Sequence, residues 1–223
     1  MNLIVAIDGP SGVGKSTASR RVASALAIPH IDTGAMYRAI GLAALREKID
    51  THDEGELGRL TARTRIDFLP GDRPRVLLNG EDVSAAIRTP QVSMAASDVS
   101  TVPTVRRALV RLQQELGRRN GGVLEGRDIG TKVFPETPHK FFLRAHPEVR
   151  ARRRFDELQA RGAGANFETV LAETLARDEQ DTTRADSPLR WDESYVVIDT
   201  SNLSIDEVVE AIVGTVRKTM NER

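Results

Sequence analysis

The chain of 223 residues contains no cysteine, which excludes disulfide bonds, thiolate chemistry and cysteine-ligated zinc sites. This absence is compatible with a reducing compartment. Aromatic residues are also scarce, at 4% of the chain. The core must therefore be built mainly from Ala, Val, Leu and Ile.

No charge of one sign predominates, because 32 basic residues balance 32 acidic residues. The chain therefore lacks a global field that would attract nucleic acid or a membrane surface. Among the basic residues, five are lysine and 27 are arginine. Codon bias is the main explanation of this imbalance. A functional contribution remains open, because the arginine guanidinium binds two phosphate oxygens at once better than lysine does.

Long apolar runs are missing, and no stretch approaches the length of a membrane-spanning helix. The first residues carry no basic segment of the kind that opens a signal peptide. We therefore expect a cytoplasmic monomer that acts on small molecules and binds neither nucleic acid nor a membrane.

Short apolar runs alternate with amphipathic stretches along most of the chain, a pattern that predicts an α/β fold. The predicted strands of the main sheet are 3–7, 30–32, 122–126, 140–143 and 195–199. The predicted helices are 15–27, 34–48, 102–119, 147–159, 167–181 and 204–218. Together they indicate a five-stranded, mostly parallel sheet wrapped by helices.

The pattern changes between residues 63 and 90, where two predicted strands, 65–69 and 75–78, stand close together. The turn between them falls at 70–72, and Asn79 and Gly80 form the turn that follows. This β-rich island predicts a small insert.

The strongest local signal is a phosphate-binding loop that matches G-x-x-x-x-G-K-S between a predicted strand and a predicted helix. It comprises Gly9, Pro10, Ser11, Gly12, Val13, Gly14, Lys15 and Ser16. Glycines let the backbone curl so that N–H groups converge on phosphate oxygens, and the helix adds its positive end. Lys15 supplies charge to the β- and γ-phosphates, the Ser16 hydroxyl can ligate Mg²⁺, and Thr17 sits near the α-phosphate. The loop predicts the P-loop NTPase fold and binding of a nucleoside triphosphate. It does not indicate which reaction the nucleotide undergoes.

Charged residues follow the ends of two predicted strands. Arg38 lies one turn into the helix behind Asp32 and Thr33, while Arg127 and Asp128 come directly after a strand. Because the carboxyl ends of parallel strands border the ligand crevice, we expect both groups to face the phosphate loop. Taken alone, a solvated helix accounts for Arg38 equally well, and Arg127 with Asp128 could be a structural ion pair.

Arg177, Asp181 and Arg184 fall at i, i+4 and i+7, which places two guanidinium groups around a carboxylate on one predicted helix face. Taken alone, this spacing is typical of a surface salt-bridge ladder. The joint interpretation favours a site, because one acceptor phosphate needs several cations. The four histidines lack metal-ligand spacing, and core packing or exposure is the better account of them.

Several segments of the chain resemble the nucleoside monophosphate kinases, and one branch closely, the bacterial cytidylate kinases. They are the phosphate loop with Asp8 and Thr17, then 31–38 (IDTGAMYR), 95–97 (AAS), 105–106 (VR), 125–130 (EGRDIG) and 177–184. These segments run in family order over nearly the whole chain. The β-rich island resembles the insert of the bacterial branch. The resemblance implies transfer of the γ-phosphoryl group of ATP, with Mg²⁺, to CMP or dCMP, as in pyrimidine nucleotide metabolism.

The resemblance also implies a role for each candidate residue. The implied catalytic residues are Lys15, Arg127 and Arg184, and the implied ATP site is 9–17. The implied CMP site comprises a phosphate clamp (Arg38, Arg127, Arg184), residues that contact the cytosine edge (Ser97, Arg106, Asp128), pentose contacts (Arg177, Asp181), and Asp32 with Thr33. Thr33 stands where some members of the family have serine.

One kinase domain over residues 1–223 is a further implication, with an acceptor-binding insert region at 63–100 and a lid at 150–166 that closes over ATP. The lid begins with Arg150, Arg152, Arg153 and Arg154, of which we expect no more than one or two to reach phosphate. For most of the four, a solvated basic helix is the better account.

Other functions remain open from the residues alone. A GTPase switch would need D-x-x-G and N-K-x-D, and neither string occurs. A nucleotide-dependent binding or assembly module would not require the arginines. Among kinases, UMP, AMP and shikimate-like acceptors are the alternatives. A phosphate acceptor fits best, because a monoester with a second pKa of about 6 is already dianionic and needs no catalytic base.

Overall fold

The computed structural model describes residues 2–69, 74–160, 162 and 164–222, and the chain divides into two compact units. The first unit comprises Met1–His30 and Gly121–Arg223, and the second comprises Ile31–Asn120. The turn predicted at 70–72 lies outside the described residues, as do residues 161 and 163 of the expected lid.

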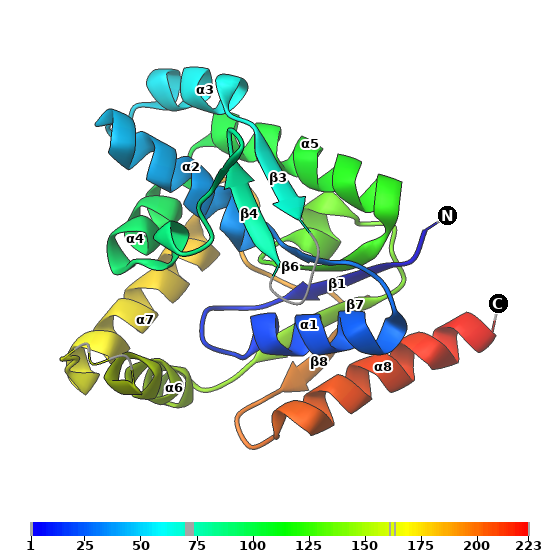
Figure 1. Cartoon of the computed structure of the whole chain (residues 1–223). Helices are drawn as coiled ribbons and strands as arrows, with labels where there is room; N and C mark the ends of the chain where they lie inside the picture. The colour runs from blue at the N-terminus through cyan, green and yellow to red at the C-terminus, as the bar shows by residue number, and fades with distance from the viewer. Residues whose placement is uncertain (1, 70–73, 161, 163, 223) are drawn as a thin grey trace. The chain divides into compact units, whose positions relative to one another are not determined.

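The first unit is built on a five-stranded sheet with the order β2-β6-β1-β7-β8 (Figure 1). Its strands are β1 (Ile4–Asp8), β2 (His30–Asp32), β6 (Gly122–Gly126), β7 (Lys140–Arg144) and β8 (Val196–Asp199). The pairings of β1 with β6, β1 with β7 and β7 with β8 are all parallel. The predicted sheet is confirmed, and the chain passes into the second unit at β2.

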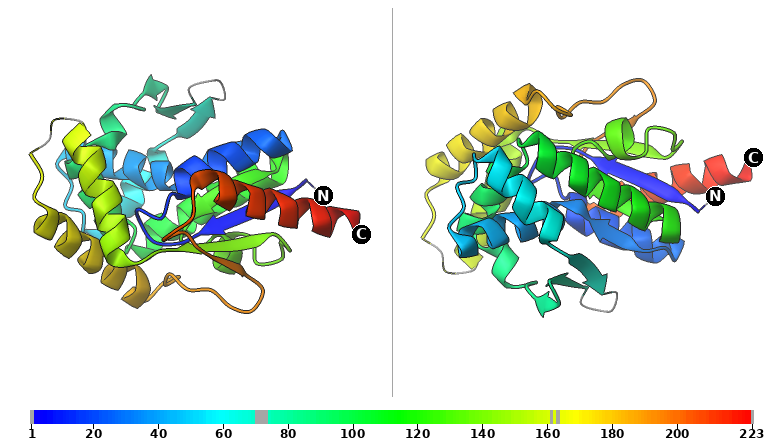
Figure 2. Two further views of the ribbon diagram at one scale, coloured as in Figure 1. Left: turned by 90° about the horizontal axis from the view of Figure 1, so that it is seen from below. Right: turned by 90° about the horizontal axis from the view of Figure 1, so that it is seen from above.

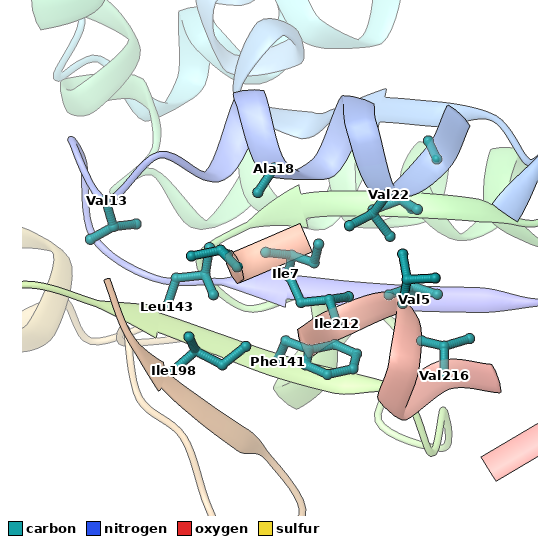
Figure 3. Close-up of a cluster of buried hydrophobic side chains, with 14 residues drawn as sticks. Val5, Ile7, Val13, Ala18, Val22, Phe141, Leu143, Ile198, Ile212 and Val216 are labelled. Carbon is teal, nitrogen blue, oxygen red and sulfur yellow. The ribbon is translucent and has the colours of Figure 1, made fainter. Parts of the chain in front are cut away.

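Two helices, α1 (Lys15–Leu26) and α8 (Ile205–Asn221), lie side by side against this sheet (Figures 1 and 2). Apolar residues of both helices share one buried cluster with Val5 and Phe141 of the sheet (Figure 3). Full burial of one such side chain stabilises the fold by about 1.5–3 kcal/mol. A capping box, in which Ser204 and Glu207 bond reciprocally, begins α8. This packing holds the start of α1, and with it the phosphate loop, in a fixed place.

The first unit also contains α6 (Pro147–Ala160) and α7 (Phe167–Thr183), which lie side by side (Figure 2). Between β6 and β7 the chain forms a short π-helix, Ile129–Val133, which the sequence pattern does not predict. In the part of the chain that the structure describes, no helix has the length and apolar character needed to cross a membrane.

The second unit contains four α-helices and a small antiparallel sheet among its described residues. The helices are α2 (Thr33–Glu47), α3 (Glu54–Arg63), α4 (Pro90–Val99) and α5 (Pro103–Asn120), with a 3₁₀ turn at Ala86–Arg88. The sheet has the order β3-β4-β5, from Ile66–Leu69, Arg75–Leu78 and Glu81–Asp82. The β-rich island is therefore confirmed, and α2 and α5 also match their predicted ranges.

Helices α3 and α4 were missing from the sequence pattern, although both carry start signals. Asp53 caps α3, and its side chain accepts a hydrogen bond from Glu56 N at 2.8 Å. Thr89 caps α4, and the first residue of that helix is Pro90. Helix α4 packs tightly on α2, since a Cβ added at Gly41 would lie 2.9 Å from the backbone nitrogen of Ala96. Glycine at 41 therefore permits the close approach that places the segment 95–97 beside α2.

A buried carboxylate, Asp8, ties the end of β1 to the segment after β6. It accepts hydrogen bonds from the backbone nitrogens of Ile129 and Gly130 and from the Tyr195 hydroxyl, each at 2.9 Å. Burial raises the pKa of Asp8 from 3.8 to about 6, although these three bonds act in the opposite direction. Asp8 therefore anchors the π-helix that follows Arg127 and Asp128.

The raised pKa of Asp8 predicts a pH dependence of stability. Between about pH 4 and pH 6 the folded protein binds more protons than the unfolded chain, so the stabilising contribution of Asp8 falls as the pH rises. The shift from 3.8 to about 6 corresponds to about 3 kcal/mol. We expect the free energy of unfolding of the wild type, relative to Asp8→Asn, to fall by up to this amount over that range in urea denaturation.

Parallel pH profiles for the wild type and Asp8→Asn would contradict this prediction. A second variant, Tyr195→Phe, removes one hydrogen-bond donor to the carboxylate. Its profile should therefore shift to higher pH than that of the wild type.

Candidate active site

The phosphate loop runs between β1 and α1 as predicted. At two of its positions, neighbouring segments of the chain lie so close that only glycine fits. Gly9 has φ 147°, and a Cβ there would lie 2.2 Å from the carbonyl oxygen of Leu143. Gly12 has φ 77°, and its Cβ would lie 3.0 Å from that of Arg150. A side chain at either position would push the loop away from the sheet or from α6.

Carbonyl groups of the loop are held from outside by α6 and the segment after β8. Arg150 donates from Nη1 to Ser11 O at 3.2 Å, and the Thr200 hydroxyl donates to Val13 O at 3.1 Å. Arg153 in turn donates to Thr200 O at 2.6 Å. With its carbonyls occupied in this way, the loop is held in a conformation whose N–H groups can serve a phosphate.

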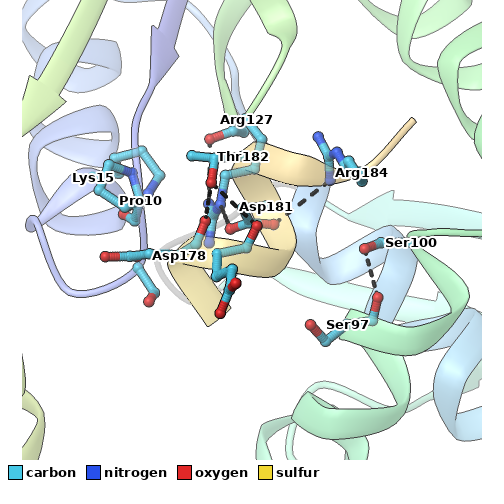
Figure 4. Close-up of polar contacts among 12 residues, drawn as sticks. Pro10, Lys15, Ser97, Ser100, Arg127, Asp178, Asp181, Thr182 and Arg184 are labelled. Carbon is cyan, nitrogen blue, oxygen red and sulfur yellow. Dashed lines mark hydrogen bonds and ion pairs between the residues drawn. The ribbon is translucent and has the colours of Figure 1, made fainter. Parts of the chain in front are cut away.

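Lys15 is buried at the first position of α1, and its Nζ donates to Pro10 O at 2.6 Å (Figure 4). Burial lowers the pKa of Lys15 well below 10.5, and the positive charge of Arg127 lowers it further. The carboxylates of Glu125 and Asp181 act in the opposite direction. An anion among these groups would favour the ammonium form, which suits a lysine that meets phosphate oxygens.

Ser16 points its hydroxyl at an acid that the sequence interpretation did not select. Its Oγ donates to Glu125 Oε2 at 2.8 Å, and His30 Nε2 lies 2.9 Å from the other carboxylate oxygen. Glu125 is buried near the carboxyl end of β6, one residue before Gly126. The expectation that every histidine serves only packing or lies exposed therefore needs correcting for His30.

A second buried carboxylate, Asp181, joins two of the predicted clamp arginines. Arg127 Nε donates to Asp181 Oδ2 at 2.7 Å, and Arg184 Nη1 lies 3.6 Å from Asp181 Oδ1 (Figure 4). The side chains of Asp181 and Arg184 are only 8% and 5% exposed. A surface salt-bridge ladder is therefore excluded for this group.

The charges of this cluster stabilise one another. Burial by itself would raise the pKa of Asp181, but the charge and hydrogen bond of Arg127, with further help from Arg184 and Arg177, hold it below its ordinary value. Burial opposes the charge of Arg127 in the same way, but Asp181 outweighs it and raises the pKa of the guanidinium. Because Asp181 also acts on the pKa of Lys15, four basic residues interact with this one carboxylate.

The predicted single helix face needs one correction. Helix α7 ends at Thr183, and Arg184 has the non-helical angles φ −58° and ψ 140°. Its Nε donates to Ser187 O at 2.7 Å. Arg184 therefore reaches Asp181 from the segment after the helix and not from one turn further along it.

Asp128 is buried, and its backbone begins the π-helix by accepting from Lys132 N at 2.8 Å. The charge of Asp128 contributes to the raised pKa of Asp8. The two acids therefore lie close enough to interact, and the segment 127–130 is rigidly placed by backbone as well as side-chain bonds.

In the second unit, Asp32 and Arg38 form a pair at the start of α2. Asp32 caps the helix by accepting from Ala35 N at 3.0 Å, and Arg38 Nη2 donates to its other oxygen at 2.7 Å. Each of the two side chains is 26% exposed. Thr33 is buried as the first residue of α2. Arg38 is therefore held on its helix by Asp32 and does not extend freely into solvent.

Ser97 and Arg106 meet through a shared neighbour, Ser100. The Ser100 hydroxyl donates to Ser97 O at 2.7 Å (Figure 4). Arg106 Nη1 donates to Ser100 O at 3.0 Å. Arg106 is 2% exposed, and its guanidinium lies 5.8 Å from the centre of the Tyr37 ring. The second unit thus brings two of the predicted cytosine readers together at the junction of α4 and α5.

The four arginines at the start of α6 have different surroundings. Arg150 is buried, contacts Ser11 and forms a bidentate pair with Asp178. Arg153 binds Thr200, Arg152 stacks on Phe155 and Phe167, and Arg154 pairs with Glu157. Arg150 is therefore one of the exceptions that the expectation of a solvated basic helix, made for most of the four, left open.

Three acids that organise the site have little signal in the sequence alone. Asp8, Glu125 and Asp178 each lie beside a residue that a motif selects, but sequence does not say which side chains they meet. Asp8 and Glu125 have a usable signal, because each is the lone acid in an otherwise apolar or small-residue strand. A charge buried in such a strand requires a partner.

A solved structure of similar fold is an uncharacterized protein from Eubacterium ventriosum. It aligns with a TM-score of 0.56 and 13% sequence identity, covering 98% of this chain and 99% of that chain. At this identity the likeness concerns the fold alone.

Sequence comparisons are more specific. The family model described as cytidylate kinase matches residues 5–218. A protein named cytidylate kinase from Syntrophotalea carbinolica is 51% identical over 215 residues, which cover 96% of this chain and 92% of that protein. Another of the same name, from Caldicellulosiruptor bescii, is 48% identical over 93% of this chain and 92% of its own length. The chain therefore belongs to the cytidylate kinase family.

Proposed function

We propose that this chain transfers the γ-phosphoryl group of ATP to CMP or dCMP, giving ADP and CDP or dCDP. Family membership supports the reaction, and the grouping of Lys15, Arg127 and Arg184 around Asp181 is the observation that carries it. Two polyanions repel each other strongly, and such a concentration of positive charge offsets that repulsion.

On the donor side, the loop 9–17 binds the phosphates of ATP through its backbone N–H groups and the start of α1. Lys15 neutralises the β- and γ-phosphate oxygens. Burial lowers the pKa of Lys15, whereas negative phosphates beside it favour its ammonium form. Binding of the nucleotide and protonation of the lysine therefore support each other.

The residues around Ser16 suit Mg²⁺. The Ser16 hydroxyl and the Glu125 carboxylate supply hard oxygen ligands 2.8 Å apart. Among the described residues, no group of three or more His, Cys, Asp or Glu could form an all-protein cage. Mg²⁺ commonly binds through one or two protein oxygens, water and substrate phosphates. When bound, the ion supplies charge neutralisation of the β- and γ-phosphates.

On the acceptor side, Arg127 and Arg184 bind the phosphate of CMP, and the family resemblance assigns Arg38 to the same phosphate. Asp181 holds the first two guanidinium groups at one carboxylate, so they need little rearrangement to meet a dianion. The acceptor oxygen is already deprotonated at neutral pH and attacks without a base. The catalytic demand is therefore met by positioning and charge.

The remaining acceptor contacts follow the family resemblance. Ser97, Arg106 and Asp128 read the cytosine edge, and Arg177 with Asp181 binds the pentose. The linkage of Ser97 to Arg106 through Ser100 supports a shared role for these two. We also propose that 63–100 is the acceptor-binding insert region, that 150–166 is the lid over ATP, and that the protein acts as a cytoplasmic monomer.

The direct test is a panel of acceptors with ATP and Mg²⁺. We expect ADP to form in proportion to added CMP or dCMP, and much more slowly with UMP, AMP or shikimate. Formation of ADP at the same rate with and without any acceptor would contradict a kinase. Equal rates with all nucleoside monophosphates would contradict cytosine reading by Asp128 and its partners.

Changing Lys15 to Ala should depress turnover with every acceptor alike, by at least about 100-fold, because the charge on the transferring phosphoryl group is lost. The measurement is kcat for CMP and dCMP under saturating ATP. Lys218→Ala, at an exposed position in α8, is the matched control and should behave as wild type. A Lys15→Ala protein with near-normal kcat would refute the role given to this lysine.

Changing Asp128 to Ala should damage CMP turnover far more than ATP binding. Loss of a buried charged contact to the base costs about 2 kcal/mol or more, hence at least about 30-fold in kcat/KM for CMP. The dissociation constant for ATP, measured by calorimetry without acceptor, should change by less than about twofold. Equal losses in both quantities would place Asp128 outside the cytosine site.

A further inference from the structure

His30 occupies a position that the kinase chemistry described above does not use. It is the first residue of β2, and its side chain is 13% exposed. Its Nε2 lies 2.9 Å from Glu125 Oε1, while Glu125 Oε2 accepts from the Ser16 hydroxyl at 2.8 Å. The three side chains therefore form a continuous line from β2 through β6 to the phosphate loop.

Both oxygens of Glu125 are thus engaged, from opposite ends of the carboxylate. An ionised carboxylate only accepts hydrogen bonds, so the imidazole Nε2 carries the hydrogen of this contact. With the Ser16 contact alone, the carboxylate could rotate or swing away. With His30 on the second oxygen, its plane and position are both determined.

We propose that His30 is a positioning residue for the Mg²⁺ that accompanies ATP. It holds Glu125 in the orientation in which the carboxylate meets Ser16, so that these two oxygen groups together can serve the ion. The inference rests on the proposed binding of ATP–Mg²⁺. It assigns a function to a histidine whose sequence pattern indicates only core packing or exposure.

Burial favours this role over simple packing. The Glu125 side chain is 5% exposed, so without His30 the carboxylate would lose one of its hydrogen bonds in a place shielded from water. A histidine that served only to fill space would have no need to meet the acid that also contacts the phosphate loop. Groups that orient a metal ligand in this way typically contribute about 10- to 100-fold to metal affinity.

The test compares ATP binding by calorimetry in Mg²⁺ and in EDTA, without acceptor, for the wild type, His30→Phe and His30→Gln. The phenylalanine keeps the ring volume but lacks the donor, whereas the glutamine amide can still donate to Glu125. We expect Mg²⁺ to strengthen ATP binding in the wild type, and this strengthening to fall by about 10-fold in His30→Phe. Binding in EDTA should change by less than about twofold, and His30→Gln should retain most of the wild-type effect.

Two controls separate the possible failures. Glu125→Gln should lose the Mg²⁺ effect, and His52→Phe, at an exposed position, should keep it. If Glu125→Gln loses the effect while His30→Phe keeps it, the positioning role of His30 is wrong and the proposed kinase function is untouched. If the wild type itself gains nothing from Mg²⁺, the metal role within the proposed function fails, and the inference about His30 fails with it.

A purely structural role would give a different result. In that case His30→Phe would weaken ATP binding equally in Mg²⁺ and in EDTA, and its thermal unfolding temperature would fall with the affinity. That outcome would overturn the proposal. The dependence of kcat on Mg²⁺ concentration supplies a second readout, in which His30→Phe should need about 10-fold more Mg²⁺ for half-maximal rate.

Discussion

Positive charge concentrated in a buried place is unfavourable unless counter-charges hold it there, and the first unit is organised around this constraint. Lys15, Arg127 and Arg184 would repel one another without the carboxylate of Asp181 between the two guanidinium groups. The effect is visible in the pKa of Lys15, which burial and Arg127 together depress. A site prepared in this way gains its full stabilisation only when anionic phosphate joins it.

The same constraint explains why buried acids recur near the carboxyl end of the parallel sheet. Asp8 is the last residue of β1 and anchors the π-helix, and Glu125 lies near the end of β6 and meets Ser16. Asp178, a partly exposed residue of α7, pairs with Arg150 beside the phosphate loop. Each acid therefore fixes a segment that carries a proposed phosphate-binding or acceptor-binding group. Rigid placement matters because transfer between two phosphates needs positioning more than it needs a base.

Much of the fold could be predicted from local pattern. The strands of the main sheet, the helices α1, α2, α5 and α8, and the β-rich island all follow from apolar period and turn residues. The misses have physical causes. Helices α3 and α4 are ten residues each, so the helical pattern of apolar residues repeats over few turns. The caps at Asp53 and Thr89 therefore carry most of the signal. The π-helix depends on Asp8, which is more than a hundred residues away.

What the sequence by itself determined is the phosphate loop, the α/β alternation and the family, because these rest on residues that are neighbours along the chain. What only the tertiary structure decided is which charges meet. Arg184 reaches Asp181 from beyond the end of α7, Arg150 is buried, and His30 contacts Glu125 across 95 residues. Such contacts depend on the packing of strands and helices, and spacing along the chain carries no information about it.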